Sequence, residues 1–427
     1  MKTELIKRII QDQEIERKRI FEEERIVERD VDKNFFCEML KHPNILTILG
    51  LRRCGKSVLS WLILKDERFG YVNFDDERLY GLKADDLNAI LKAFYELYGD
   101  IEYIILDEPQ NVRGWELFAN RLRRTKKVII TGSNSKLLSG ELATHLTGRH
   151  VDFILYPFSF REFLRYNGVN LKDINRYAYA TSTEARISKL LLQYIEKGGL
   201  PESYKFGKNI LRSIFSDIIK KDILVRHEIK KVKTMEDTVK YMISNFSKPF
   251  TYNKLRNVFG MKIDTVENYI GYMEDAYLIE IIKKFSFKLK EQRISPKKVY
   301  CIDTGFINIV AFRFFEDYGR VMENLVAIEL KRRGEEIYYW RDYSGREVDF
   351  VVKEGVKVKE LIQVCYDIED LSTKNRELRA LIRAGKELKC KNLKVITWDY
   401  EAKEEFKNRK IRFVPLWKWL LQIKTRS

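Results

Sequence analysis

Short, predominantly apolar runs alternate with stretches of helical spacing over the first 165 residues of the chain. Runs that are apolar at every position are typical of strands buried on both faces of a parallel sheet. The stretches between them have the length and periodicity of helices, most clearly at 58–64 and 87–98. This alternation predicts an α/β fold with a parallel sheet. The runs are residues 45–49, 70–74, 103–106, 127–131 and 151–155, and residues 103–106 are apolar at every position.

The pattern changes three times along the rest of the chain, which predicts four successive domains. Before the first apolar run, a narrow apolar stripe of helical period predicts an N-terminal helix that packs on the α/β core, with a partner-binding arm as the alternative. The stripe consists of Leu5, Ile6, Ile9 and Ile10. The four domains are an α/β core at 1–165, a helical lid at 166–235, a segment of short helices at 236–299 and an α/β domain at 300–427.

A glycine-bounded loop follows the first apolar run and leads into an apolar helix. Residues 50–57 read Gly-x-x-x-x-Gly-Lys-Ser, in the strand–loop–helix context that gives this pattern its meaning. Backbone N–H groups of such a loop, together with the helix N-terminus, cradle the phosphates of a nucleotide. Lys56 would reach the β- and γ-phosphates of ATP, and the Ser57 hydroxyl would hold Mg2+. The nucleotide-binding residues expected here are Gly50, Leu51, Arg52, Arg53, Cys54, Gly55, Lys56, Ser57 and Val58.

Three side chains inside this loop add chemistry of their own. Arg52 and Arg53 either place positive charge beside the phosphates or face solvent. Cys54 lies where the helix dipole would lower the pKa of a thiol, which predicts sensitivity to oxidation.

Acidic and polar residues stand at the ends of the next two apolar runs. Asp107 and Glu108 end one run, so they emerge at the carboxyl edge of the sheet, where open α/β folds bind their ligands. Asp107 is placed to hold Mg2+ through water, and Glu108 is placed to orient and polarise an attacking water. Ser133 and Asn134 end the other run. Either of them would sense the γ-phosphate or hold the water, unless it only caps a turn or helix.

Arg149 precedes the last apolar run. A guanidinium at this point would stabilise the negative charge of a phosphoryl-transfer transition state. It would act within the chain or across a subunit interface, and the second case implies a homo-oligomer. A surface ion pair is the alternative.

Together these motifs resemble the AAA+/STAND-related ATPases of archaea and many bacteria. The resemblance covers residues 40–230 and includes Thr131-Gly132-Ser133 and the Pro-Phe-Ser-Phe-Arg-Glu-Phe sequence at 157–163. It implies a P-loop NTPase fold whose added catalytic-glutamate strand lies between the phosphate-loop strand and the aspartate strand. It also implies a helical lid whose Gly-x-Pro element brings Pro201 near the adenine. A plain helix-terminating turn is the alternative for Pro201.

The middle segment has the spacing of a winged helix-turn-helix. Two short helices flank a turn at Gly260, and the run at 276–282 reads as the first strand of the wing. The hairpin at 283–298 carries seven Lys and Arg residues against one acid and includes Phe285 and Phe287. Basic residues with interleaved aromatics are typical of DNA backbone contacts. Because the second helix is acidic, we expect DNA contact through this hairpin or a purely structural winged helix.

From residue 300 the chain resembles the restriction-endonuclease-like domain that often follows such ATPases. An active domain of this kind has an Asp and then Glu-x-Lys on the next strand, which bind Mg2+ and support the nucleophilic water. Asp349 is in place and Glu323 would serve as an upstream acid. However, Gln363 replaces the Glu of the motif, and Cys365 replaces the Lys. We therefore predict a degenerate domain that does not cleave and still holds DNA or a protein partner.

Composition narrows the class of partner. The 427 residues carry a formal net charge of +17, which favours a polyanion such as DNA. A Lys/Glu-rich thermophilic surface is the alternative, although it does not explain the excess of one sign. No apolar run reaches 18 residues and the N-terminus lacks an apolar signal core, so we expect no membrane contact and a cytoplasmic location. The five scattered cysteines indicate neither disulfides nor a zinc site.

The sequence thus predicts a Mg2+-dependent ATPase that acts on or with DNA. A nucleotide-gated scaffold or switch for a protein partner, with slow turnover, is the alternative. An active nuclease is disfavoured by Gln363 and Cys365.

Overall fold

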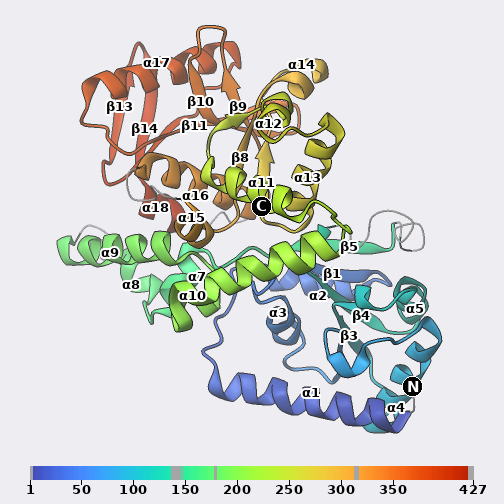
Figure 1. Cartoon of the computed structure of the whole chain (residues 1–427). Coiled ribbons are helices and arrows are strands. Elements are labelled where there is room, and N and C mark those ends of the chain that lie inside the picture. Colours follow the sequence, from blue (N-terminus) through green and yellow to red (C-terminus); the bar gives the residue numbers. More distant parts are fainter. Residues whose placement is uncertain (1–2, 136–145, 147, 177–179, 312–316, 422–427) are drawn as a thin grey trace. The chain divides into compact units, whose positions relative to one another are not determined.

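The computed structural model describes residues 3–135, 146, 148–176, 180–311 and 317–421 (Figure 1). The chain divides into two compact units, which we describe separately. The N-terminal unit consists of Met1–Pro157, Arg165–Asn167 and Asp275–Tyr277, and the C-terminal unit of Phe158–Leu164, Gly168–Glu274 and Leu278–Ser427.

A five-stranded sheet in the order β2-β3-β4-β1-β5 forms the core of the N-terminal unit, and all of its neighbouring strands are parallel. β1 is buried at every position, including Thr47, as its predominantly apolar sequence predicts. The predicted α/β fold with a parallel sheet is therefore confirmed. The strands are β1 (Ile45–Leu49), β2 (Phe69–Asn73), β3 (Tyr103–Asp107), β4 (Lys127–Gly132) and β5 (His150–Ile154).

A further strand does lie between the phosphate-loop strand β1 and the aspartate strand β3. This strand is β4, which ends in Thr131 and Gly132. The glutamate itself is elsewhere, because Glu108 directly follows β3.

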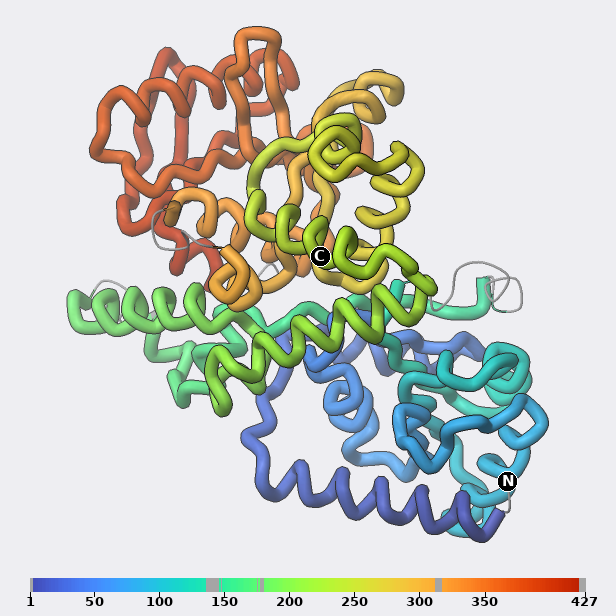
Figure 2. The backbone as a smooth tube through the Cα atoms, in the orientation of Figure 1, coloured from blue at the N-terminus to red at the C-terminus, as the bar shows by residue number. Residues whose placement is uncertain are grey.

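The N-terminal helix packs within the same unit, against β2 and α4 (Figure 2). Its buried apolar residues are Ile6, Ile9 and Ile10, which confirms the predicted stripe, whereas Leu5 is 45% exposed. The side chain of Gln13 exchanges two hydrogen bonds with the backbone of Asn73, of 2.9 and 3.1 Å, and so fixes the helix to the end of β2. The helices of this unit are α1 (Thr3–Glu23), α2 (Lys33–Lys41), α3 (Lys56–Ile63), α4 (Leu87–Tyr98) and α5 (Trp115–Leu122), with short 3-10 helices η1 (Glu77–Leu79), η2 (Ala84–Asp86) and η3 (Pro109–Asn111).

The C-terminal unit begins with a helical part. A reciprocal cap starts its first helix, because the Ser159 N–H donates to the Glu162 carboxylate and the Glu162 N–H donates to the Ser159 hydroxyl. The helices are α7 (Phe160–Tyr166), α8 (Leu171–Arg176), α9 (Thr181–Lys197), α10 (Pro201–Asp217), the π-helix η5 (Ile218–Val225) and α11 (Val232–Ser244).

A three-stranded antiparallel sheet in the order β6-β8-β7 follows. Two helices with a left-handed Gly260 between them lie between its first two strands along the chain, and the short α14 interrupts the segment between β7 and β8. The boundary expected between residues 299 and 300 falls inside β8. The elements are β6 (Pro249–Phe250), α12 (Tyr252–Phe259), α13 (Ile263–Asp275), β7 (Ile279–Ile282), α14 (Leu289–Ile294) and β8 (Lys297–Cys301).

The last part of the unit is a six-stranded mixed sheet in the order β13-β14-β12-β11-β10-β9. α17 packs on β10 and β11, and Phe285 from the β7–β8 segment joins the hydrophobic core of this sheet. Its elements are α15 (Thr304–Val310), α16 (Tyr318–Arg332), β9 (Glu336–Arg341), β10 (Glu347–Glu354), β11 (Lys357–Cys365), α17 (Leu371–Glu387), β12 (Leu393–Thr397), β13 (Ala402–Phe406), β14 (Arg409–Pro415) and α18 (Leu416–Leu421). Within the described ranges, none of the helices combines the length and the apolar character that a bilayer span requires.

Candidate nucleotide site

The loop between β1 and α3 has a backbone shape that its two glycines permit. Gly50 has φ of 148°, and a Cβ at this position would lie 2.2 Å from the carbonyl oxygen of Leu155. Gly55 has φ of 98° and directly precedes α3. Both values lie in the region that glycine adopts without strain. The loop therefore lies close to the segment after β5, and it continues directly into the N-terminus of α3.

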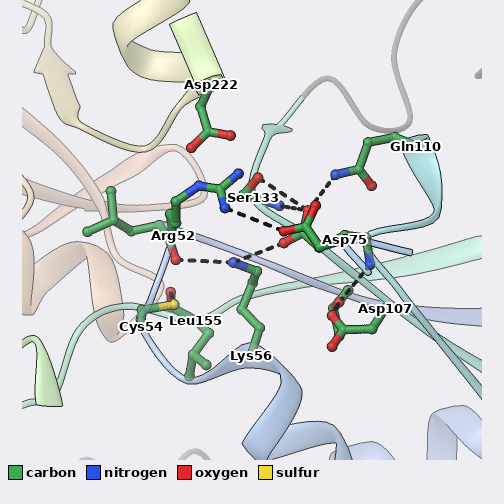
Figure 3. A network of polar contacts seen from close by, with 12 residues as sticks. Arg52, Cys54, Lys56, Asp75, Asp107, Gln110, Ser133, Leu155 and Asp222 are labelled. Atoms are coloured by element: carbon green, nitrogen blue, oxygen red, sulfur yellow. Dashed lines mark hydrogen bonds and ion pairs between the residues drawn. The ribbon is translucent and has the colours of Figure 1, made fainter. Parts of the chain in front are cut away.

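Lys56 is the first residue of α3, and it is buried, with 6% exposure. Its Nζ donates a hydrogen bond of 3.2 Å to the carbonyl oxygen of Leu51 and lies 3.5 Å from Oε1 of Glu108. Figure 3 shows Lys56, Ser133 and Gln110 directed toward the same carboxylate. The lysine of the loop and the acid after β3 are therefore in direct contact.

Asp107 is buried at the end of β3, and each of its two carboxylate oxygens accepts a hydrogen bond from a hydroxyl group. The Tyr71 hydroxyl donates to its Oδ2 over 2.7 Å, and the Thr131 hydroxyl donates to its Oδ1. Burial, and secondly the charge of Glu108, raises the pKa of Asp107, whereas hydrogen bonds from Thr131, Tyr71 and Ser57 oppose this rise. A carboxylate beside the Ser57 hydroxyl provides the oxygen ligands that Mg2+ prefers, so the residues present fit this ion.

Glu108 has a strained backbone and a firmly held side chain. Its φ of 52° and ψ of 47° are left-handed, which is uncommon for a residue other than glycine and recurs at functional sites. Its Oε2 accepts hydrogen bonds from the Ser133 N–H (3.1 Å), the Ser133 hydroxyl (3.2 Å) and the Gln110 amide. Burial raises the pKa of Glu108, but the Lys56 ammonium and the Gln110 hydrogen bond outweigh it, and the net effect is a lowered pKa. The side chain is therefore an ionised carboxylate at neutral pH.

The structure separates the two polar candidates after β4. Ser133 contacts the Glu108 carboxylate with both its N–H and its hydroxyl. Asn134 is buried, with 3% exposure, one residue further from β4. Ser133 is thus the residue that links β4 to the acid after β3.

Arg29 is a residue of this site that the sequence did not reveal. It lies between α1 and α2, is 8% exposed, and donates hydrogen bonds to the carbonyl oxygens of Cys54 (2.9 Å) and Tyr156 (2.6 Å). One guanidinium thereby joins the phosphate loop to the segment after β5. A single arginine in a charge-dense stretch carries no local signal of this role. Tyr71 in β2 and Gln110 in η3 were also not predicted, because neither belongs to a recognisable sequence motif.

The Arg29→Ala variant is expected to lose about 1–3 kcal/mol in the free energy of unfolding, because two buried carbonyl oxygens lose their donor. Urea titration followed by circular dichroism measures this loss. The matched control is Arg53→Ala, since Arg53 is exposed in the same loop. Equal stability of the two variants would contradict a supporting role for Arg29.

Two predictions for the N-terminal unit are corrected by the structure. The Arg149 carbonyl oxygen accepts from the N–H of Ile45, the first residue of β1, whereas the phosphate loop follows the other end of that strand. Arg149 therefore lies at the opposite edge of the sheet and cannot act within its own site. Of the two predicted roles, only the one across a subunit interface remains.

Cys54 is fully buried, with its thiol directed at the Leu155 carbonyl oxygen. Burial raises the pKa of this thiol, which contradicts the predicted redox sensitivity.

The two loop arginines differ in their surroundings. Arg52 lies 3.5 Å from a carboxylate oxygen of Asp75, and its charge also lowers the pKa of Glu108. Arg53 is exposed, and so is consistent with the solvent-facing alternative. Val58 lies in the first turns of α3.

Pro201 is the first residue of α10 in the C-terminal unit. The glycines before it are explained by packing inside that unit. A Cβ on Gly198 would lie 1.8 Å from the Asp303 carboxylate, which also accepts a 2.6 Å hydrogen bond from the Gly199 N–H. A contact between Pro201 and adenine stays a prediction.

The structure brings part of the predicted nuclease site together. Glu323 on α16 and Asp349 on β10 both contact the ammonium of Lys298, at 2.8 and 3.3 Å. The Gln363 amide donates to Glu377 instead, and the Cys365 thiol is directed at the carbonyl oxygen of Asp367. Two residues of the predicted basic hairpin are also buried and cannot contact DNA, since Phe285 is 7% and Lys298 is 2% exposed.

Comparison with known proteins gives the family. The uncharacterized protein MJ1544 of Methanocaldococcus jannaschii is 36% identical over 422 residues, which cover 93% of this chain and 91% of that protein. The chain belongs to the family of this protein. An uncharacterized protein of Haemophilus influenzae is 27% identical, with 88% of this chain and 94% of that protein covered.

Three family models divide this sequence. Residues 42–164 match an AAA domain, residues 188–316 a domain of unknown function (DUF8612) and residues 318–419 another domain of unknown function (DUF4143). Residues 42–164 of this chain thus form an AAA-type P-loop domain, as predicted. Among solved structures, the Walker-type ATPase PABY2304 of Pyrococcus abyssi is 14% identical, with 67% of this chain and 97% of that chain covered, at a TM-score of 0.41. A TM-score of this size establishes neither a shared fold nor a shared function.

Proposed function

We propose that the N-terminal unit binds ATP with Mg2+ and hydrolyses the γ-phosphate. The observation that carries this proposal is the convergence of Lys56, Asp107 and Glu108 at one edge of the sheet. Lys56 begins α3, whereas the adjacent residues Asp107 and Glu108 stand at the end of β3, and the Lys56 ammonium lies 3.5 Å from a Glu108 carboxylate oxygen. Convergence of a cation, a metal-binding carboxylate and an ionised base is what phosphoryl transfer to water requires.

The residues divide the chemistry among them. The loop N–H groups and the Lys56 ammonium bind the phosphates and neutralise the charge that develops on the γ-phosphoryl oxygens. Glu108 orients the attacking water and accepts its proton at an Oε atom. Ser133 and Gln110 fix the position of that carboxylate. When bound at Ser57 and Asp107, Mg2+ would supply charge stabilisation between the β- and γ-phosphates.

The existing contacts of Glu108 favour slow basal turnover. Its carboxylate contacts Lys56 and accepts three hydrogen bonds from Ser133 and Gln110. A phosphate that binds the Lys56 ammonium would break the ion pair between Lys56 and Glu108, and so would change the charge around the Glu108 carboxylate. The site therefore also suits a nucleotide-gated switch, in which a partner stimulates hydrolysis.

Steady-state phosphate release by the purified chain tests the proposal. We expect hydrolysis that requires Mg2+ and is lost when EDTA is in excess. If the chain binds nucleotide but hydrolyses none, whether or not duplex or single-stranded DNA is present, the nucleotide-gated switch would be the function. Absence of nucleotide binding would overturn both.

For the partner, we propose that the segment between β7 and β8 contacts nucleic-acid backbone. Its tip exposes Phe287 and Leu289, at 78% and 80%, among exposed basic side chains. Burial lowers the pKa of Lys297, and the like charges of Lys283 and Arg293 lower it further, whereas Glu267 and Glu274 partly oppose this shift. Cations held this close to one another are stabilised by a polyanion.

The triple variant Lys288→Ala, Lys290→Ala, Arg293→Ala is expected to weaken DNA binding and to reduce the slope of log K against log salt by up to about 3. Fluorescence anisotropy over a salt series measures both. The matched control removes Lys403, Lys407 and Lys410, which are equally exposed on the β13–β14 hairpin. Equal slopes for the two triple variants would show that only net charge matters and would contradict this interface.

A further inference from the structure

The strongest unexplained cluster lies in the C-terminal unit, where one buried ammonium meets three carboxylates. Nζ of Lys298 lies 2.8 Å from Glu323, 2.5 Å from Glu347 and 3.3 Å from Asp349. Burial alone would lower the pKa of Lys298, but these acids, Glu323 foremost, and Tyr300 raise it well above its usual value. The side chain is therefore a permanent cation, although it is only 2% exposed.

Each of the three carboxylates also has another partner. The Tyr300 hydroxyl donates a 2.7 Å hydrogen bond to Oε1 of Glu323, the same oxygen that Lys298 contacts. The Val364 N–H donates to Oδ2 of Asp349 over 2.9 Å. The Arg341 guanidinium lies 3.9 Å from Oε2 of Glu347. The acids are thus arranged around an ammonium and a set of N–H and O–H donors.

The neutral residues of the expected motif point elsewhere. Gln363 accepts from the backbone N–H of Asp349 with its carbonyl and donates to Glu377 with its NH2 group, so both halves of its amide have partners other than Lys298 and the carboxylates around it. Burial raises the pKa of the Cys365 thiol to about 12, so it is not an anionic ligand. Across the part of the chain that the structure describes, no three His, Cys, Asp or Glu side chains come together as a metal site would require.

A divalent ion, which the restriction-endonuclease-like resemblance implies, therefore does not fit these residues. We infer that the Lys298 ammonium takes the place of that ion. Glu323, Glu347 and Asp349, which we call the acid cluster, bind this ammonium and thereby hold β8 against the C-terminal sheet. We call the acid cluster together with Lys298 the latch. Its three carboxyl groups come from α16 and β10, whereas its cation comes from β8. One cation between acids of separate elements joins them as a structural metal ion would.

Other contacts across the same junction agree with a latch. The Asn324 side chain, next to Glu323 on α16, accepts from the Cys301 N–H and donates to the Cys301 carbonyl oxygen, each over 2.8 Å. The Phe285 N–H donates to the Tyr339 carbonyl oxygen of β9 over 2.7 Å. Strand β8 and the six-stranded sheet are therefore built to stay together.

The inference is tested by removal of the internal cation and a search for an external one. Mn2+ is titrated, without nucleotide, into the wild-type chain and into Lys298→Ala, by calorimetry and by the melting temperature. We expect no Asp349-dependent Mn2+ binding in the wild type. The melting temperature of Lys298→Ala should be lower than that of the wild type, and Mn2+ should reverse part of this decrease. The affinity of Lys298→Ala for Mn2+ should be at least about tenfold higher than that of the wild type.

Three controls make the result decisive. Lys298→Ala with Asp349→Asn should lose the Mn2+ effect, and Lys297→Ala, which alters the neighbouring lysine of the same strand, should not gain it. If Lys298→Ala does not fold alone, refolding is compared in Mn2+ and in KCl of equal ionic strength, and recovery in Mn2+ only supports the latch. The inference is overturned if Mn2+ neither binds nor rescues Lys298→Ala, or if the wild-type chain binds Mn2+ or cleaves DNA in a manner that Asp349→Asn abolishes.

Discussion

Glu108→Gln is expected to bind ATP as tightly as the wild-type chain, or more tightly, and to hydrolyse it about 10²–10⁴-fold more slowly. Glutamine keeps the size of the side chain and can still accept from Ser133, so the loop around it should hold its shape. It cannot accept a proton from water. It also releases Lys56 from its ion pair with residue 108, so that the ammonium is available to the phosphates.

The measurement is ATP affinity with a fluorescent nucleotide, followed by single-turnover hydrolysis. Glu102→Gln is the matched control, because Glu102 is exposed just before the other end of β3. It should leave both values unchanged. A Glu108→Gln variant with the wild-type hydrolysis rate would remove Glu108 from the mechanism.

Lys56→Ala is expected to weaken ATP binding by at least about 100-fold, which corresponds to about 2.7 kcal/mol. The ammonium is the buried cation of the phosphate loop, and its loss also leaves the half-buried Glu108 carboxylate without this charge partner. An unpaired anion in this place repels the γ-phosphate, so two effects act in the same direction.

Isothermal titration calorimetry with ATP measures the affinity, and the melting temperature of the variant shows whether the fold persists. Lys65→Ala, an exposed lysine just after the same helix, is the control and should bind ATP normally. Tight ATP binding by a folded Lys56→Ala chain would contradict the proposed site.

Much of the N-terminal unit follows from local sequence, because its central strands are predominantly apolar. β1 and β3 lie where their apolar runs predict, and the acids after β3 emerge beside the phosphate loop because parallel strands share one carboxyl edge. The winged-helix and nuclease-like interpretations of the later segments stay predictions.

What the sequence did not reveal is mostly contact between distant segments. Arg29 supports a loop 25 residues further along the chain, and the pairing of Lys298 with Asp349 spans 51 residues. Neither residue differs locally from the many other basic residues of this chain. For Lys298 the local signal is that this lysine lies within a strand, directly before the apolar residues Val299, Tyr300 and Cys301, and a count of basic residues in the hairpin concealed it. The misplaced Arg149 shows the converse error, since a motif order along the chain does not say which edge of a sheet a side chain reaches.

The Lys298 ammonium is covalently part of the chain that it holds together. A metal ion in the same position would leave when its free concentration falls or when a chelator competes, and the domain would then loosen. A tethered ammonium cannot be diluted away. The junction between β8 and the C-terminal sheet is therefore independent of metal supply, and an excess of EDTA should stop the ATPase while this junction stays intact.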